Sequence, residues 1–226
     1  VDKLVSLFQK QNYLLLDNCP VIFIYRDFDE RLREDFIELL KTKCQDFGFD
    51  GVKVVFCEVT DQLTNYDYKV LDFQPNKTEA IDIFFNKNRL IKSIFQTRFA
   101  YFFSKLLKEK TNFVKTIDYI KYRDFIVSRY QSSNSKRLIP CIFPSWDNSA
   151  RRSSPLIVQN LDPRAFSQWL YGAKSFIDSS DLNNDEKIIV INAWNEWAEG
   201  CHLEPCTKLN DSFLNEIRKF ALGASN

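Results

Sequence analysis

The sequence lacks several features that mark particular classes of protein. Its 226 residues include no methionine and one histidine, His202. Positive and negative side chains nearly cancel, with 31 Lys and Arg against 30 Asp and Glu, which leaves no net field to attract nucleic acid or an anionic membrane. The longest apolar runs are strand-length, well short of the roughly 20 residues of a membrane span. We therefore expect a soluble chain with no nucleic-acid partner and no membrane span.

The start of the sequence is unusual as well. It opens on Val1, and no basic region followed by an apolar signal core is present. We expect the natural start to be missing. The hydrophobic content of 45% is enough for one domain with a substantial core, so residues 1–226 are predicted to form a single domain.

Cysteine usage argues against a metal centre. The six cysteines are scattered without a CxxC motif, and a lone histidine adds little to a ligand set, so we expect no metal and no cofactor. Unpaired cysteines in apolar runs favour a reducing cytoplasm, although a bridge between Cys201 and Cys206 is an alternative. The six are Cys19, Cys44, Cys57, Cys141, Cys201 and Cys206.

Short β-rich runs alternate with helical stretches, which predicts βα units around a parallel sheet. An amphipathic helix is expected over 30–47, closed by Gly48, and another over 163–176 with Asp162 as its N-cap. A last helix is expected over 211–222. The four predicted strands are 21–25, 52–57, 138–143 and 188–193.

Two segments do not fit a plain βα connection. Residues 66–75 suggest an irregular, aromatic-rich loop, and residues 78–130 suggest a mostly helical insertion. Four parallel strands cannot close a barrel, and an eight-stranded barrel needs about 250 residues. The predicted fold class is therefore α/β, half of a TIM-like (β/α)8 barrel. The missing half or a second chain would have to cover its sheet edges.

Reactive groups in parallel α/β folds gather where strands end. Carboxylates follow each predicted strand here, arginines follow the first and third, and tryptophans follow the third and fourth. Tyr25 and Arg26 come first, and Glu58 follows the second strand as a weaker candidate. The remaining candidates for substrate binding are Trp146, Asp147, Asn148, Arg151, Trp194, Asn195 and Trp197.

Glu196 and Glu199 form the strongest candidate pair. They are three residues apart where a strand must bend into a helix, and in a helical turn such side chains are neighbours. Retaining glycosidases use two carboxylates about 5–5.5 Å apart. Flanking tryptophans could stack on sugar rings, and Asn195 could bond to hydroxyls. The alternative is structural: one glutamate pairs with Arg26 or Arg151, and both tryptophans belong to the core.

A resemblance sharpens this prediction. The run Ile-Asn-Ala-Trp-Asn-Glu-Trp-Ala-Glu-Gly over 191–200, followed by Leu-Glu-Pro over 203–205, resembles the closing signature of the WbsX-like family, which is related to family-99 glycoside hydrolases. The segment Phe-Pro-Ser-Trp-Asp-Asn-Ser-Ala-Arg-Arg over 143–152 also resembles that family, as do 20–26 and 163–170. Nearly all of the chain is covered, most weakly over 78–131.

The resemblance implies the C-terminal half of a (β/α)8 barrel that acts on oligosaccharides or polysaccharides without a metal. In the related hydrolases, the residue matching Glu196 assists the 2-hydroxyl in displacing the leaving group, and that matching Glu199 serves as general acid and then base. Cys206 and Asn210 depart from the family pattern, which has Asp and Gly there. His202 and Glu204 are expected to be supporting residues.

Three functions remain open at this point. The first is a retaining glycan-cleaving enzyme, and the second is a glycosyltransferase of O-antigen or capsule synthesis, the label that the family carries. No glycine-rich phosphate loop is present to hold an activated donor. The third is a non-catalytic carbohydrate-binding half barrel. Asp147 and Arg151 could bind substrate or form an ion pair with each other.

Overall fold

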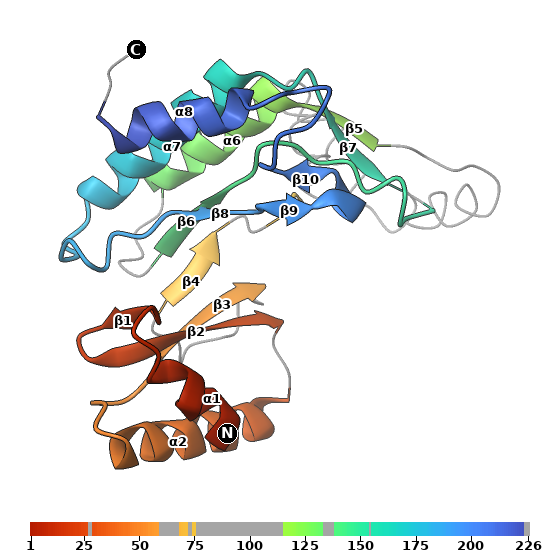
Figure 1. Ribbon diagram of the computed structural model, residues 1–226. Coiled ribbons are helices and arrows are strands. Elements are labelled where there is room, and N and C mark those ends of the chain that lie inside the picture. The colour runs from red at the N-terminus through yellow and green to blue at the C-terminus, as the bar shows by residue number, and fades with distance from the viewer. Residues whose placement is uncertain are drawn as a thin grey trace. The chain divides into compact units, whose positions relative to one another are not determined.

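The structure is a computed structural model with two compact units (Figure 1). It describes residues 1–26, 29–58, 68–71, 74–75, 115–132, 138–153 and 155–223. The first unit comprises Val1–Phe73, Asn134–Pro140 and Ile177–Val190, and the second comprises Gln74–Ser133, Cys141–Phe176 and Ile191–Asn226.

The first unit is built on a mainly parallel sheet. Strand β2 pairs in parallel with β3, β3 with β4, and β4 with the first residues of β6, while β1 pairs antiparallel with β2. Helices α1 and α2 enclose a core with β3 that includes Phe8, Leu40 and Phe56. The elements are α1 (Asp2–Phe8), β1 (Leu15–Leu16), β2 (Cys19–Arg26), α2 (Glu30–Asp46), β3 (Lys53–Glu58), β4 (Tyr68–Leu71) and β6 (Leu138–Ile142).

Local sequence explains the bounds of α2. The Asp29 carboxylate accepts a hydrogen bond from the Leu32 amide at 3.1 Å, which caps the first turn. At the other end Gly48 takes a φ of +88°, which glycine adopts without steric cost. The helix predicted over 30–47 is therefore confirmed.

The second unit combines three helices with short strands. Helices α6, α7 and α8 lie side by side (Figure 1), with rings in contact between Tyr130 and Phe176 and between Phe166 and Phe213. Asp162 caps α7 by accepting from the Arg164 amide at 2.8 Å, as predicted. The elements are β5 (Lys115–Asp118), α6 (Tyr119–Ser132), β7 (Leu156–Gln159), α7 (Pro163–Asp178), β8 (Val190–Ile191), β9 (Asn195–Glu196), the 3-10 turn η1 (Trp197–Glu199), β10 (Cys201–His202) and α8 (Ser212–Ala221).

A buried aromatic cluster forms the centre of this second unit. Its ring centroids lie between 5.1 and 6.3 Å apart, mostly in tilted or edge-on arrangements. The buried Tyr119 hydroxyl donates to the Phe143 carbonyl at 2.8 Å, which satisfies a polar atom that burial would otherwise penalise. The buried aromatic cluster consists of Tyr119, Tyr122, Phe143, Trp146 and Trp169.

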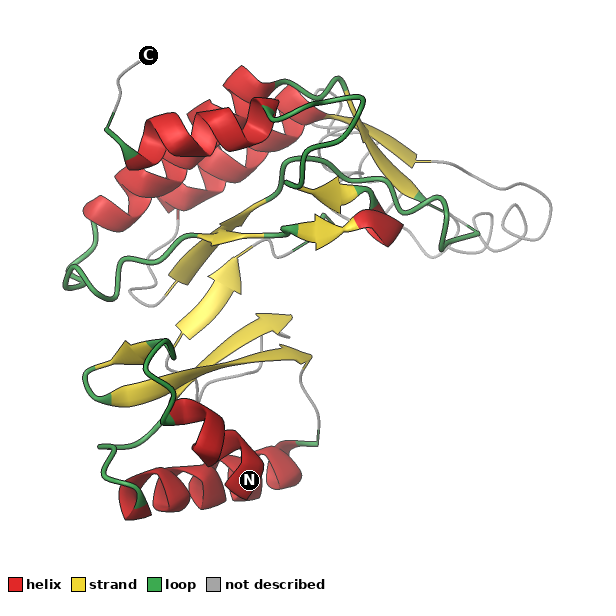
Figure 2. Cartoon of the chain, viewed as in Figure 1, coloured by secondary structure: helices red, strands yellow, loops and turns green. Residues whose placement is uncertain are grey.

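The α/β class with parallel strands is confirmed, and Figure 2 shows helices and strands in both units. The part of the chain that the structure describes contains no closed barrel: its largest sheet has the open order β1-β2-β3-β4-β6-β8. The half-barrel interpretation therefore stays a prediction. The single domain over residues 1–226 also stays a prediction.

Several predicted bounds are wrong. Residues 68–71, inside the predicted loop 66–75, form β4, and 115–118, inside the predicted helical stretch, form β5. Both are four-residue strands that gain their hydrogen bonds from distant neighbours. The last predicted strand, 188–193, shortens to β8. The rest of the proposed insertion up to residue 114 lies outside the described residues.

The cysteines and the helices bear on two further predictions. All six cysteines are free thiols, so the alternative bridge between Cys201 and Cys206 is not formed. Within the described ranges, no helix combines the length and apolarity that crossing a membrane requires.

Candidate active site

The motif at 194–204 folds into a small hairpin. Strands β9 and β10 pair antiparallel, with Glu196 opposite Cys201 and Asn195 opposite His202. The 3-10 turn η1 connects them and ends at Gly200, whose φ of +55° is left-handed. The strand predicted to bend towards a helix thus bends through a single tight turn.

A second segment closes against this turn. The Asp147 amide donates to the Glu199 carbonyl at 2.8 Å, and the Ser145 hydroxyl donates to the Gly200 carbonyl at 2.6 Å. A Cβ atom on Gly200 would lie 3.0 Å from the Asp147 Cβ and 3.1 Å from its backbone N and O. Glycine is required here by both the backbone conformation and the close approach.

The two candidate carboxylates meet at one arginine. The Arg151 Nη1 atom lies 3.5 Å from Glu196 Oε1 and 3.3 Å from Glu199 Oε1. Glu196 stands directly before the 3-10 turn and Glu199 is its last residue, so the turn brings both side chains to the same nitrogen. One cationic group therefore faces two anionic ones.

The separation and exposure of the carboxylates suit chemistry on a substrate. The Oε1 atoms of Glu196 and Glu199 both lie within 3.5 Å of Arg151 Nη1, so these two oxygens must be close to each other. Inverting glycosidases separate their two carboxyl groups by about 6.5–9.5 Å, and most of that range is too long for this pair. The Glu196 side chain is 42% exposed and that of Glu199 is 16% exposed. Glu196 is thus open to a ligand, whereas Glu199 is more enclosed.

A turn in the second segment presents Arg151. The Asn148 side-chain oxygen accepts from the Leu156 amide at 2.8 Å, and the Asn148 carbonyl accepts from the Arg151 amide at 3.0 Å. Asp147 Oδ1 accepts from the Ser149 amide at 2.9 Å. Among the described residues, Arg151 contacts the two glutamates instead of forming the alternative ion pair with Asp147.

The tryptophans divide into two classes. Trp194 and Trp197 are 53% and 51% exposed, so the structural alternative is wrong in placing both in the core. Its other part, a glutamate paired with Arg151, is confirmed. Trp146 is 2% exposed and packs on Phe143. The ring of Trp146 is thus enclosed, and its contact with substrate stays a prediction. Asn195 is exposed beside the exposed pair.

Trp197 is held by two residues that sequence analysis assigned only a supporting role. Its Nε1 donates to Glu204 Oε2 at 2.6 Å, and its ring stacks on that of His202 with centroids 3.8 Å apart and planes 18° apart. Burial lowers the pKa of His202, against the opposing effect of Glu204. The imidazole therefore stacks as a neutral ring at neutral pH.

Within the hairpin, Cys201 of β10 is buried and its thiol donates to the Asn192 carbonyl at 2.7 Å. Burial raises the pKa of this thiol strongly, so it is protonated at neutral pH and unsuited to nucleophilic attack. The described residues contain no group of three or more His, Cys, Asp and Glu side chains that could hold a metal.

The candidates from the first two predicted strands lie in the first unit. Tyr25 is exposed on β2, and Arg26 is in register with Glu58 of β3. The side chains of Arg26 and Glu58 lie outside the described residues. These three residues stay predictions.

Comparison with known proteins identifies the family. The family model described as Glycosyltransferase WbsX matches residues 1–217. The chain belongs to the WbsX glycosyltransferase family. This membership confirms the resemblance carried by the two tryptophan-containing motifs and indicates a glycan-active domain.

Two curated relatives share part of the sequence. Both are named Uncharacterized protein WxcX, from Xanthomonas campestris pv. campestris strains B100 and ATCC 33913, and each is 36% identical over 83 residues. The match covers 36% of this chain and 12% of each relative, so this WbsX-family domain corresponds to a small part of those proteins. No solved structure matches the chain.

Proposed function

We propose that this WbsX-family domain cleaves glycosidic bonds with retention of configuration, using Glu196 and Glu199 as the reacting carboxylates. One observation carries the proposal: both carboxylates converge on Arg151 Nη1, at 3.5 and 3.3 Å, beside two exposed tryptophans. Paired carboxylates supply the proton transfers of glycoside hydrolysis, and exposed aromatic faces suit sugar rings.

The resemblance to family-99 hydrolases suggests which proton transfer each carboxylate carries out. Glu196, the more exposed of the two, accepts the proton of the 2-hydroxyl as that oxygen displaces the leaving group. Glu199 gives its proton to the departing glycosidic oxygen, which leaves a 1,2-anhydro sugar. Water then opens this ring at C1: Glu199 removes a proton from the water, and Glu196 returns its proton to the 2-oxygen. Arg151 compensates the negative charge that Glu199 gains when its proton leaves.

The architecture that we propose for the whole enzyme is a (β/α)8 barrel, of which this chain supplies the C-terminal half. The parallel strands of the described sheet support it, and the open strand order leaves edges for the other half or a second chain to cover. Five buried free thiols favour a reducing compartment, so we place the reaction in the cytoplasm.

The first experiment compares Glu199→Gln and Glu196→Gln with the parent in the full-length protein, assayed for release of reducing ends from bacterial surface polysaccharides. We expect each variant to lose about 10²–10⁴-fold in kcat/KM, since each removes a proton-transfer group. The matched control is Glu34→Gln, which changes an exposed glutamate on α2. Unchanged cleavage by Glu199→Gln would refute the proposal.

A second candidate function is glycosyl transfer from an activated donor, favoured by the family's description. Incorporation of labelled sugar that depends on a nucleotide-sugar donor would select this function. Cleavage without a donor, giving a retained anomer by NMR, would select hydrolysis.

A further inference from the structure

Trp197 is more constrained than an exposed side chain needs to be. Glu204 fixes the indole N–H at 2.6 Å, and His202 covers one ring face at 3.8 Å. The side chain nevertheless remains 51% exposed, so much of its surface is open to a ligand. Holding an aromatic ring in place before binding lowers the entropy that a ligand must overcome.

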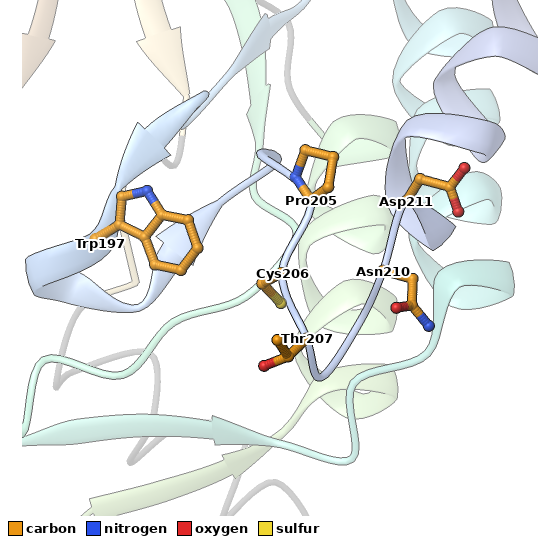
Figure 3. Close-up of a pocket in the computed structure, with 6 residues that line it drawn as sticks. All are labelled: Trp197, Pro205, Cys206, Thr207, Asn210 and Asp211. Carbon is orange, nitrogen blue, oxygen red and sulfur yellow. The ribbon is translucent and has the colours of Figure 1, made fainter.

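This ring borders a hollow of about 810 Å³ (Figure 3). Trp197 and Pro205 line it together with the polar residues Thr207, Asn210 and Asp211. An aromatic face combined with neutral and acidic hydrogen-bonding groups matches the surface of a pyranose, which has apolar C–H patches and a rim of hydroxyls. Cys206 completes the lining.

The wall of the hollow has its own internal structure. The Asn210 amide donates to the Cys206 carbonyl at 2.7 Å, and the Leu209 amide donates to the Cys206 sulfur at 3.3 Å. Asn210 adopts a left-handed φ of +49°, which asparagine tolerates better than most residues. These contacts hold the lining residues in place without a ligand.

We propose that this hollow is a second sugar subsite, which binds a pyranose ring next to the one that reacts at Glu196 and Glu199. Trp197 is its stacking platform, Thr207 and Asn210 bond to hydroxyls, and Glu204 and His202 are positioning residues that set the ring of Trp197. The choice of a sugar as ligand rests on the proposed function. A substrate of at least two sugar units follows from the assignment.

The test uses the full-length protein on an array of bacterial surface oligosaccharides, followed by titration of the bound oligosaccharide with tryptophan fluorescence as the readout. The double variant Thr207→Val, Asn210→Gly removes two polar groups with little strain, because valine matches threonine in shape and glycine accepts the left-handed backbone. Lys208→Ala is the matched control, since Lys208 is exposed in the same loop and is not part of the lining.

We expect the double variant to bind about tenfold more weakly and to raise KM with little change in kcat, while Lys208→Ala behaves as the parent. Glu204→Leu should weaken binding similarly, and Glu204→Gln, which keeps an acceptor for the Trp197 N–H, should restore it. Rescue by glutamine separates a positioning role from a merely structural one.

The subsite is refuted if the double variant binds like the parent, if Glu204→Leu has no effect, or if the parent binds no oligosaccharide on the array. Failure of the proposed function is distinct. It would appear as unchanged cleavage by Glu199→Gln, whereas failure of the subsite would appear as unchanged binding by the double variant.

Discussion

Two aromatic regions of the second unit use the same residue type in opposite ways. In the buried aromatic cluster, Trp146 and Trp169 are enclosed by rings and contribute to stability. In the hairpin, Trp194 and Trp197 are half exposed beside two carboxylates. The difference shows that a tryptophan's role here follows from what surrounds it: other rings for the first pair, polar groups and solvent for the second.

The largest expected effect comes from breaking the buried aromatic cluster. Trp169→Ala should lower the free energy of unfolding by about 3–5 kcal/mol, because it leaves a cavity and removes the hydrogen bond from the indole N–H to the Tyr130 hydroxyl. Trp194→Ala, at an exposed position, should stay within about 0.5 kcal/mol of the parent. Urea denaturation followed by circular dichroism measures the free energy of unfolding of both variants. Equal losses of stability would contradict the division between buried and exposed tryptophans.

A second prediction concerns the junction that holds the hairpin. Gly200→Ala should cost about 2–4 kcal/mol, because it combines left-handed strain with a clash against Asp147. Gly48→Ala is the matched control: its φ is also positive but a Cβ there meets nothing within 4 Å, so it should cost only about 1–2 kcal/mol. The difference in stability between the two variants, measured by thermal denaturation, gives the cost of the close approach between residue 200 and Asp147. A smaller loss for Gly200→Ala than for Gly48→Ala would overturn this account.

The third prediction separates activity from stability at Arg151. Arg151→Met should reduce kcat/KM about 10–100-fold, since neither carboxylate would then have its cationic partner. Stability should change by no more than about 1 kcal/mol because the arginine is about half exposed. Cleavage assays and urea denaturation on the same preparation measure both. A large stability loss with full activity would assign the arginine to the fold instead.

The smallest expected effect is a pH dependence from His202. Burial lowers its pKa below the ordinary value of 6.5, so as pH falls through 6.5 the unfolded chain takes up a proton that the folded chain does not. This contribution to stability is therefore complete above pH 6.5 and is lost on acidification. His202→Phe keeps a stacking ring on Trp197 and should flatten the pH dependence between pH 7 and 5, measured by urea denaturation. An unchanged slope would show that other groups cause it.

Local signals predicted the longer helices well. The helix after Asp29 has a capping carboxylate, an apolar stripe and a terminal glycine, all of which act within a few residues of one another. The same holds for α7 and its Asp162 cap. Strands β4 and β5 escaped prediction because each is four residues long and depends on hydrogen bonds to β3, β6 and β7 rather than on its own sequence.

The amino-acid sequence is enough to assign the family, the parallel α/β class and the three-residue spacing of Glu196 and Glu199. The spacing is covalent, and the α/β class follows from periodic apolar residues, so neither needs knowledge of distant contacts. Three features become visible only once the chain is folded: Arg151, distant along the chain, faces both carboxylates, Trp146 is buried, and His202 and Glu204 hold Trp197. Burial and ion pairing depend on which segments the fold brings together, and no local pattern specifies that.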